Sequence, residues 1–465
     1  MLFTSLSFLL FFPSVCIIYY LIPIRIRWIY LLVVSYSFYL NWQPAYALLL
    51  FATTFITYMC AKAMDCSGIS QRQKKLYFLI GCVLPLLCLV FFKYYNFINQ
   101  SIFKLLDAVG LHISMPEMKI LLPVGISFYT FMAVGYMVDV YRGLVRAEHN
   151  LGLYALFIAF FPQVTSGPIG RAEQLIPQLK RPEPLNYNDF MAGLRIMLWG
   201  YFMKLCVADR LSMYVDAVYN NVSQHNGTTL LIASIFYTIQ IYGDFAGYSF
   251  IAIGAARIMG IRLTENFRRP YFSKNIKEFW NRWHISLSTW FRDYVYIPLG
   301  GNRVSSIRHL FNLLLTFLIS GLWHGAAWHY ILWGGVHGLF LIIETIAKKL
   351  KIQLHTSAFI RILFTFACVN FVWILFRVDA GQALTILAKI FTSIGFPFID
   401  ISVFSMGLLS LSILFIKDLH DEYGWGVNLL SSQNSLISNT TIVMLITYVV
   451  LFGVLDGGQF IYFQF

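Results

Sequence analysis

Long apolar runs recur from one end of the chain to the other, and they restrict the possible folds more than any other feature. Of the 465 residues, 58% are hydrophobic and 12% are charged, and this is about half of the charged share of a soluble protein. A soluble protein could not cover so much apolar surface with polar groups. The sequence therefore predicts a multi-pass membrane protein.

The apolar runs divide into about 11–13 segments, and all of them are expected to be helical. Only helices and closed barrels satisfy every backbone polar group in a bilayer, and these runs are too apolar for barrel strands. We find no internal repeat, so residues 1–465 are expected to form one all-α membrane domain. The expected segments are 5–22, 28–40, 44–61, 76–92, 120–140, 151–162, 190–207, 230–259, 310–322, 328–347, 359–376, 404–416 and 442–455, with an interfacial helix around 96–119.

Charge predicts the orientation. The first apolar run has no basic region before it and no clear cleavage site, so we expect a retained first span. Basic residues follow the first, third and fifth segments, and this pattern predicts an N-terminus outside the cytoplasm. The net charge of +13 fits loops that face anionic lipid. Because no Lys/Arg run marks a nucleic-acid arm, nucleic acid is not an expected partner.

The stretch 262–308 breaks the apolar pattern. It is the longest polar stretch and has nine basic residues, interleaved with aromatic residues, against three acidic ones: Glu265, Glu278 and Asp293. Aromatic rings and long basic side chains both favour the headgroup region. We therefore predict an interfacial or re-entrant segment, whose non-helical backbone is covered by protein or lines a wet cavity.

His324, in "GLWHGAAWHY", is the first candidate for chemistry. We expect it at the start of a glycine-rich helix or in the turn before it. Gly321 and Gly325 are four residues apart, and small residues at this spacing let helices or a ligand approach the backbone closely. A packed histidine that bonds a carbonyl is the structural alternative. Ionisable residues inside a membrane are nevertheless functional candidates by default.

His284, in "FWNRWHISLSTWFRDY", is the second candidate. Polar groups are dense around it and include Arg282, Ser286 and Asp293. The alternative interpretation is an interfacial histidine held by a neighbour such as Asp293. The residues that share one face of a continuous helix here are Trp280, His284, Leu287 and Phe291.

Other kinds of site find less support. His329 and His337 lie near His324, but no HExxH motif or carboxylate accompanies them, so no metal site is expected. The seven cysteines form no CxxC and are interpreted as small core residues. There is no GxSxG motif, Rossmann fingerprint or P-loop. Asp244 lies inside an apolar run, so it should have a partner or line a cavity.

Several motifs resemble those of one family, the membrane-bound O-acyltransferases. "FWNRWHISLSTWFRDYVYIPLGGNR" and "SGLWHGAAWHYILWGGVHG" are similar to its two histidine motifs. The branch that they resemble is that of the alginate O-acetyltransferase membrane subunit. "ISFYTFMAVGYMVDVYRG", "FFPQVTSGPIGR", "QIYGDFAGYS", "ENFRRPYFSKNIKEFW" and the terminal "FIYFQF" match the same branch, so the resemblance covers nearly the whole chain.

The resemblance implies a ring of helices around a central funnel, with the histidines near its narrowing. By matching position, His324 is the catalytic histidine and His284 is the second one. Relatives often have aspartate where this chain has Phe250, so Asp244 is expected to stand alone. The further candidates for substrate binding or for lining the tunnel are Trp323, Asp244, Arg282, Ser286, Asp293, Asn302 and Gly325.

The chemistry suits the residues. Transfer of an acyl group from a thioester needs a base for the attacking hydroxyl and hydrogen-bond donors for the oxyanion. Burial disfavours the charged imidazole, so a buried histidine can act as a base at neutral pH. We hypothesise that His324 is that base and that His284 orients a reactant or polarises the carbonyl. Basic residues of 262–308 would attract an anionic donor.

The resemblance also implies partners and a location. The expected donor is cytoplasmic acetyl-CoA, with no tightly bound cofactor, and the acceptor is a surface polysaccharide. An extracytoplasmic SGNH-type acetyltransferase is the expected protein partner, and the location is the bacterial cytoplasmic membrane. Two alternatives stay open: a D-alanyl transfer protein that uses an acyl carrier protein for teichoic acid modification, and a transporter or flippase in which the histidines relay protons.

Overall fold

The computed structural model describes residues 1–41, 44–112, 116–118, 121–352, 356–425, 430, 432 and 434–455. The described residues form helices and contain no β-strand, which confirms the all-α prediction. The terminal "FIYFQF" motif and the centre of the "NWQP" corner lie outside them.

Nine helices in the described ranges are long and apolar enough to cross a membrane. This is fewer than the expected segments because some apolar runs form helices that are too short. The run 151–162 gives only α7 (Leu151–Ala159), whose 9 residues extend about 14 Å, half of a hydrocarbon core. Protein buries every residue of α7 from Leu153 to Ala159, so its apolar character serves contacts inside the protein.

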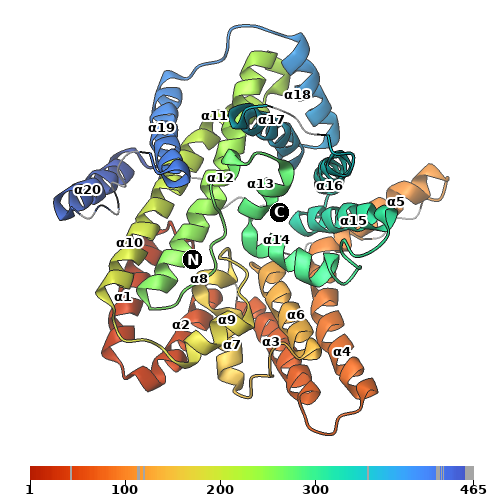
Figure 1. Ribbon diagram of the computed structural model, residues 1–465, viewed down its shortest axis with the longest axis vertical. Helices are drawn as coiled ribbons and strands as arrows, with labels where there is room; N and C mark the ends of the chain where they lie inside the picture. Colours follow the sequence, from red (N-terminus) through yellow and green to blue (C-terminus); the bar gives the residue numbers. More distant parts are fainter. Residues whose placement is uncertain are drawn as a thin grey trace. The chain divides into compact units, whose positions relative to one another are not determined.

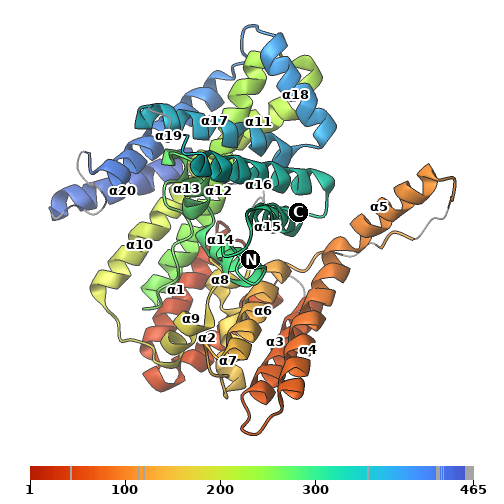
Figure 2. The ribbon, with the colours of Figure 1, turned by 45° about the vertical axis from the view of Figure 1, so that its right-hand side comes forward.

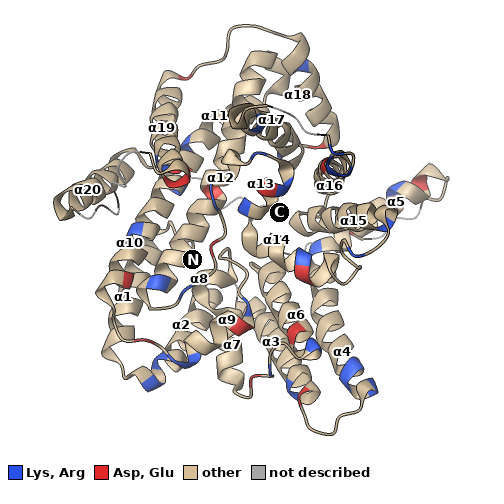
Figure 3. Cartoon of the chain, in the orientation of Figure 1, with Lys and Arg blue, Asp and Glu red and all other residues tan. Residues whose placement is uncertain are grey.

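Charged residues lie mostly at helix ends and in connecting loops (Figure 3). The stretch 96–119, where an interfacial helix was expected, contains α5 (Tyr95–Ala108), and the interfacial location stays a prediction. This helix follows α4 through a π-helical turn, η2 (Val90–Tyr94), and polar and apolar residues alternate along it at helical spacing.

The chain divides into two compact units. The expectation that residues 1–465 form one membrane domain stays a prediction. One unit comprises Met1–Met191, Ala255–Thr264 and Gly325–Ala327. In it α3, α4 and α6 lie side by side (Figures 1 and 2), while α7 packs on α2, α3 and α9. Its helices are α1 (Leu6–Leu21), η1 (Ile24–Ile26), α2 (Arg27–Leu40), α3 (Pro44–Met64), α4 (Gln71–Leu89), η2, α5, α6 (Ile126–Arg142), α7, α8 (Phe161–Val164) and α9 (Ala172–Lys180).

The other unit comprises Ala192–Gly254, Glu265–His324 and Trp328–Phe465 and holds both candidate histidines. The stretch 262–308 forms short helices and turns in place of a span. The helices that lie wholly or mostly in this unit are α10 (Tyr187–Tyr201), η3 (Phe202–Ala208), α11 (Asp209–Tyr219), η4 (Val222–Gln224), α12 (Gly227–Ile258), η5 (Pro270–Phe272), α13 (Ile276–Arg282), α14 (Ile285–Phe291), η6 (Arg292–Tyr296), α15 (Ser306–His324), α16 (Trp328–Lys349), α17 (Ala358–Arg377), α18 (Ala380–Thr392), α19 (Ile401–Tyr423) and α20 (Ser435–Phe452).

α15 packs closely on α16 (Figures 1 and 2). Gly321 lies at this crossing as expected, but its counterpart is Gly334 on α16, since Gly325 lies in the turn between the helices. A Cβ atom on Gly321 would lie 2.2 Å from the carbonyl oxygen of Tyr330, and one on Gly334 would lie 2.2 Å from that of Phe317. Neither contact can be relieved by a side-chain rotation, because both atoms belong to the backbone. The two glycines therefore set the distance between the helices that hold His324.

We predict that Gly321→Ala strongly lowers the thermal stability of the detergent-solubilised protein, because the helices must separate, as in other overpacked cores. The matched control is Gly335→Ala on α16, where a Cβ would meet only a Leu318 side-chain atom, at 3.4 Å. Unfolding followed by size-exclusion chromatography after heating measures both variants. Equal stability of the two variants would contradict this account of the crossing.

Candidate active site

His284 lies in a break between two short helices. α13 ends at Arg282 and α14 begins at Ile285, so the expected continuous face from Trp280 to Phe291 is wrong. His284 has a left-handed backbone with φ 43° and ψ 55°. A non-glycine residue in this region stores about 1–3 kcal/mol of strain, and such residues cluster at functional sites.

Aromatic rings surround the imidazole of His284, whose residue is 1% exposed. The ring centroid of Phe245 is 4.5 Å away in an edge-on contact, and that of Phe267 is 6.4 Å away in a stacked one. Burial holds the pKa of His284 well below its usual value. The imidazole is therefore neutral at pH 7 and keeps one N–H donor and one acceptor nitrogen.

His324 is the last residue of α15, and a short turn separates it from α16, so the expectation that it lies at the start of a helix or in the turn before one is wrong. It is 2% exposed. The nearest aromatic rings are those of Trp323 at 5.0 Å, Trp333 at 4.9 Å and Phe376 at 5.4 Å. The ring of Trp323 is also 6.0 Å from that of His284. One tryptophan thus contacts both candidate histidines.

The other two nearby histidines differ in setting. His337 is 0% exposed and packs edge-on against Trp280 and Trp333, each at 4.9 Å. His329 is partly exposed and lies in the first turn of α16, so it is on a different helix from His324. A structural interpretation fits both.

Asp244 has a partner, as its apolar surroundings predicted. The ammonium group of Lys204 lies 2.6 Å from Oδ1 of Asp244 and 2.7 Å from Oδ1 of Asp209. The expectation that Asp244 stands alone is wrong, because α11 supplies Asp209 as a second carboxylate. Lys204 lies in the π-helical turn η3, and a π-turn re-aims side chains within a helix. Sequence analysis did not find Lys204 or Asp209 because both lie at the end of an otherwise apolar run.

The Lys204 ion pairs hold α12 where it contacts the site, since Phe245 follows Asp244 and packs on His284. All three charged side chains are almost fully buried. Removing one partner of a buried ion pair is costly because the other charge stays buried without it.

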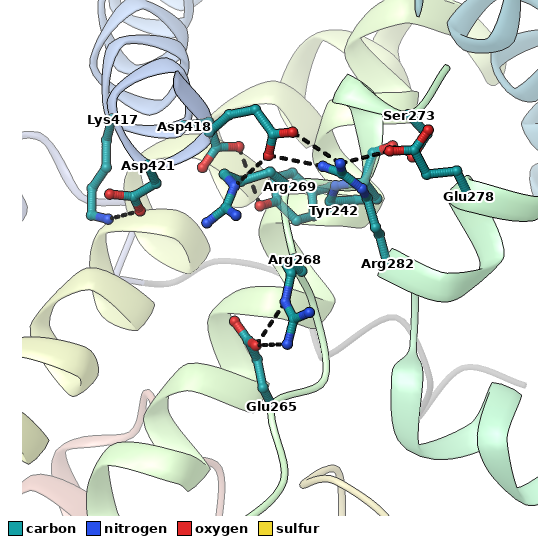
Figure 4. A network of polar contacts seen from close by, with 12 residues as sticks. Tyr242, Glu265, Arg268, Arg269, Ser273, Glu278, Arg282, Lys417, Asp418 and Asp421 are labelled. Atoms are coloured by element: carbon teal, nitrogen blue, oxygen red, sulfur yellow. Dashed lines mark hydrogen bonds and ion pairs between the residues drawn. The ribbon is translucent and has the colours of Figure 1, made fainter. Parts of the chain in front are cut away.

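Arg282 belongs to a second ionic network (Figure 4). Its guanidinium donates to both carboxylate oxygens of Glu422, at 2.8 and 2.9 Å, and to Glu278 at 2.7 Å. Arg269 donates to the same Glu422 at 2.8 Å. This network ties the C-terminal end of α19 to the segment before His284, so the geometry indicates a scaffold position for Arg282.

The remaining candidates lie in different surroundings. Ser286 is buried and donates to the side chain of Asn266 at 2.9 Å. Asp293 is partly exposed and accepts from Arg292 at 2.7 Å. Gly325 is buried in the turn after His324. Asn302 lines a cavity.

This cavity has a volume of about 960 Å³ and is bordered by α13–α16. Its exposed lining includes three basic side chains, Lys277, Arg292 and Lys348, while Glu344 is its one acidic residue among those described. Its buried lining includes Trp280 and Ser320, so the cavity has a basic rim and an apolar interior.

The cavity reaches the neighbours of both histidines. Ile285 follows His284, and Ser320 lies one helical turn before His324. Trp280 lines the cavity and packs on Trp333, with ring centroids 5.6 Å apart, and Trp333 in turn packs on His324. Two tryptophan rings therefore connect the cavity wall to His324.

Comparison with known proteins decides the family. The sequence model for "MBOAT, membrane-bound O-acyltransferase family" matches residues 144–381. The "Probable alginate O-acetylase AlgI" of Pseudomonas aeruginosa is 39% identical over 383 residues, which cover 82% of this chain and 73% of that protein. The chain belongs to the membrane-bound O-acyltransferase family. It is an acyltransferase and a multi-pass bacterial membrane protein.

Other relatives carry related activities in their names. A "Peptidoglycan O-acetyltransferase" of Helicobacter pylori is 32% identical over 377 residues, 75% of this chain and 70% of that protein. A "Teichoic acid D-alanyltransferase" of Bacillus subtilis is 34% identical over 238 residues, 48% of this chain and 59% of that protein. The similarity to the O-acetyltransferases thus extends over more of the chain, and it confirms the resemblance to the alginate branch.

We predict that Lys204→Met destabilises the protein by about 3–5 kcal/mol, because Asp209 and Asp244 would then face each other in a buried site. The matched control is Lys417→Met, whose partner Asp421 lies one turn away on the same helix and is partly exposed. Thermal unfolding in detergent compares the two variants. A Lys204→Met protein as stable as the Lys417→Met protein would contradict the anchoring role of Lys204.

Proposed function

We propose that this protein transfers an acetyl group from a cytoplasmic thioester, acetyl-CoA, for the O-acetylation of an exported or cell-surface polysaccharide. Family membership establishes the membrane O-acyltransferase class. The observation that carries the finer proposal is the pair of buried histidines in contact with Trp323, beside a cavity with a basic rim.

His324 is the proposed base. A ring nitrogen accepts the proton of the acceptor hydroxyl while the oxygen attacks the thioester carbonyl carbon. The tetrahedral intermediate then expels the thiolate, which takes the proton back from the imidazolium. His284 is the proposed polarising group, because its neutral ring has an N–H that can donate to the oxyanion.

The cavity is the proposed donor site. Its volume of about 960 Å³ is at the upper end of the range for small-molecule sites. Phosphate groups would meet Lys277, Arg292 and Lys348 at the rim, where basic side chains favour them. The thioester end would enter the apolar interior near the neighbours of His284 and His324.

Location and partners complete the proposal. We place the protein in the bacterial cytoplasmic membrane with its N-terminus outside, because basic residues follow the first, third and fifth apolar segments. The acetyl group would be received outside by an SGNH-type acetyltransferase that completes transfer onto sugar. D-Alanyl transfer from a carrier protein is the alternative, and shorter similarity to the teichoic acid enzymes speaks against it.

We predict that His324→Ala lowers O-acetylation of the surface polysaccharide by about a hundredfold or more, and that His284→Ala lowers it by about tenfold or more, as loss of a general base or an oxyanion donor does. Ester-linked acetate released by mild base measures the product in cells that produce each variant. Immunoblots of the membranes check protein abundance.

The matched control is His225→Ala, since His225 is a partly buried histidine of the same unit in the loop before α12. Full acetylation by a normally abundant His324→Ala protein would refute the assignment of the base. Substrate flux without acyl turnover would favour a transporter, and D-alanyl esters in place of acetyl esters would favour the teichoic acid branch.

We predict that the double variant Lys277→Ala/Lys348→Ala raises KM for acetyl-CoA by roughly fivefold or more and changes kcat by less than about twofold, because rim charges attract the donor without contacting the reacting atoms. Membrane vesicles with radiolabelled acetyl-CoA measure both constants. The control is Lys349→Ala, since Lys349 is next to Lys348 but donates to Ser306. An unchanged KM in the double variant would exclude the cavity as the donor site.

A further inference from the structure

We infer that Asn266 is a positioning residue that holds His284 in its left-handed conformation. The inference rests on the proposed role of His284 in acyl transfer. Asn266 lies in the segment between α12 and η5 and is 0% exposed. The sequence places Asn266 in the motif "ENFRRPYFSKNIKEFW", but its residue type and neighbours assigned it no role in the site.

Asn266 binds the residues directly after His284 with both its backbone and its side chain. Its carbonyl oxygen accepts from the N–H of Ile285 at 2.9 Å. Its side-chain oxygen accepts from the N–H of Ser286 at 3.2 Å and from the hydroxyl of Ser286 at 2.9 Å. Its amide group donates to the hydroxyl of Ser249 on α12 at 3.1 Å, which fixes the orientation of the amide.

These bonds replace a helix cap. The first N–H groups of a helix have no acceptor within the helix, and a side chain at the N-cap position commonly supplies one. The N-cap residue of α14 is His284, whose side chain makes no capping hydrogen bond. Asn266 caps α14 from a separate segment, so the imidazole is not required for this purpose.

The segment that contains Asn266 also contacts the imidazole of His284 and the residue Arg282 on the other side of the turn. Phe267 follows Asn266 and stacks on the imidazole of His284. The N–H of Arg268 donates to the carbonyl oxygen of Arg282 at 2.9 Å, just before the turn. The turn is thus bonded on both sides of His284, as a strained conformation requires in order to persist.

The chemistry of asparagine fits this position. The side chain must accept from Ser286 and donate to Ser249. Aspartate could not donate when ionised and would bury a charge, and alanine would leave buried donors without acceptors. Loss of Asn266 should therefore let the turn relax and displace His284 from the reacting carbonyl.

The test compares kinetic constants of Asn266→Ala in membrane vesicles with radiolabelled acetyl-CoA. We expect kcat to fall by about tenfold or more and KM for the donor to change by less than about twofold, because misplacement of a catalytic group affects the transition state more than binding. In a His284→Ala background, Asn266→Ala should lower kcat by less than about twofold further, since residues that act through one group are non-additive.

The matched control is Asn370→Ala. Asn370 is also buried and makes two side-chain hydrogen bonds to α12, with Ser234 and Thr238, but these bonds do not reach the turn at His284. It should lose thermal stability and keep its kcat. If Asn266→Ala does not fold, Ser249→Ala removes the acceptor for the Asn266 amide and should lower kcat by roughly threefold.

The outcomes separate the two proposals. A His284→Ala protein with wild-type activity refutes the role of His284 and the inference with it. A His284→Ala protein with strongly lowered kcat, beside an Asn266→Ala or Ser249→Ala protein with unchanged kcat, overturns the positioning role alone. The positioning role is also overturned if Asn266→Ala lowers kcat in the His284→Ala background by roughly the same factor, about tenfold, as in the wild type. Such a loss would show an effect independent of His284.

Discussion

Non-helical backbone inside a membrane protein must be covered by protein or lie against water, because lipid offers no hydrogen bonds. The turn at His284 shows how this chain meets that constraint. The two helices on either side are only seven residues long each, and the polar groups between them are bonded to a neighbouring segment of the same unit. This coverage permits a histidine in a strained conformation among aromatic rings.

Buried ion pairs also fix how the helices of the scaffold pack. Lys204 pairs with Asp244 on α12, and Glu422 on α19 binds Arg282 and Arg269 from the segment 262–308. Each cluster joins elements that are distant in the sequence. Because a buried charge without its partner is costly, such clusters disfavour alternative packings of helices that are otherwise uniformly apolar. The contact between Phe245 and His284 depends on the position of α12, which the Lys204 pairs maintain.

The sequence was sufficient for the all-α class and the membrane location, because apolar runs carry local information. Its long motifs also singled out the two histidines, whose catalytic roles stay a proposal. It also predicted a partner for Asp244 from the cost of a buried carboxylate. The sequence was insufficient where contacts between distant segments determine the structure. The helix break at His284 depends on Asn266, which is 18 residues earlier in the chain. Helical periodicity alone predicted that α13 continues through His284. The partners Lys204 and Glu422 were missed because nothing in their local sequence points to α12 or Arg282.

The basic groups proposed to attract the donor are separate from the histidines proposed to do the chemistry. The basic side chains at the cavity rim are exposed, so salt screens their effect on an anionic donor. The two histidines are buried among aromatic rings instead, and burial keeps the pKa of His284 well below its usual value. The neutral ring of His284 therefore keeps an N–H for the oxyanion. High salt should accordingly weaken capture of the donor at the rim while leaving this N–H of His284 in place.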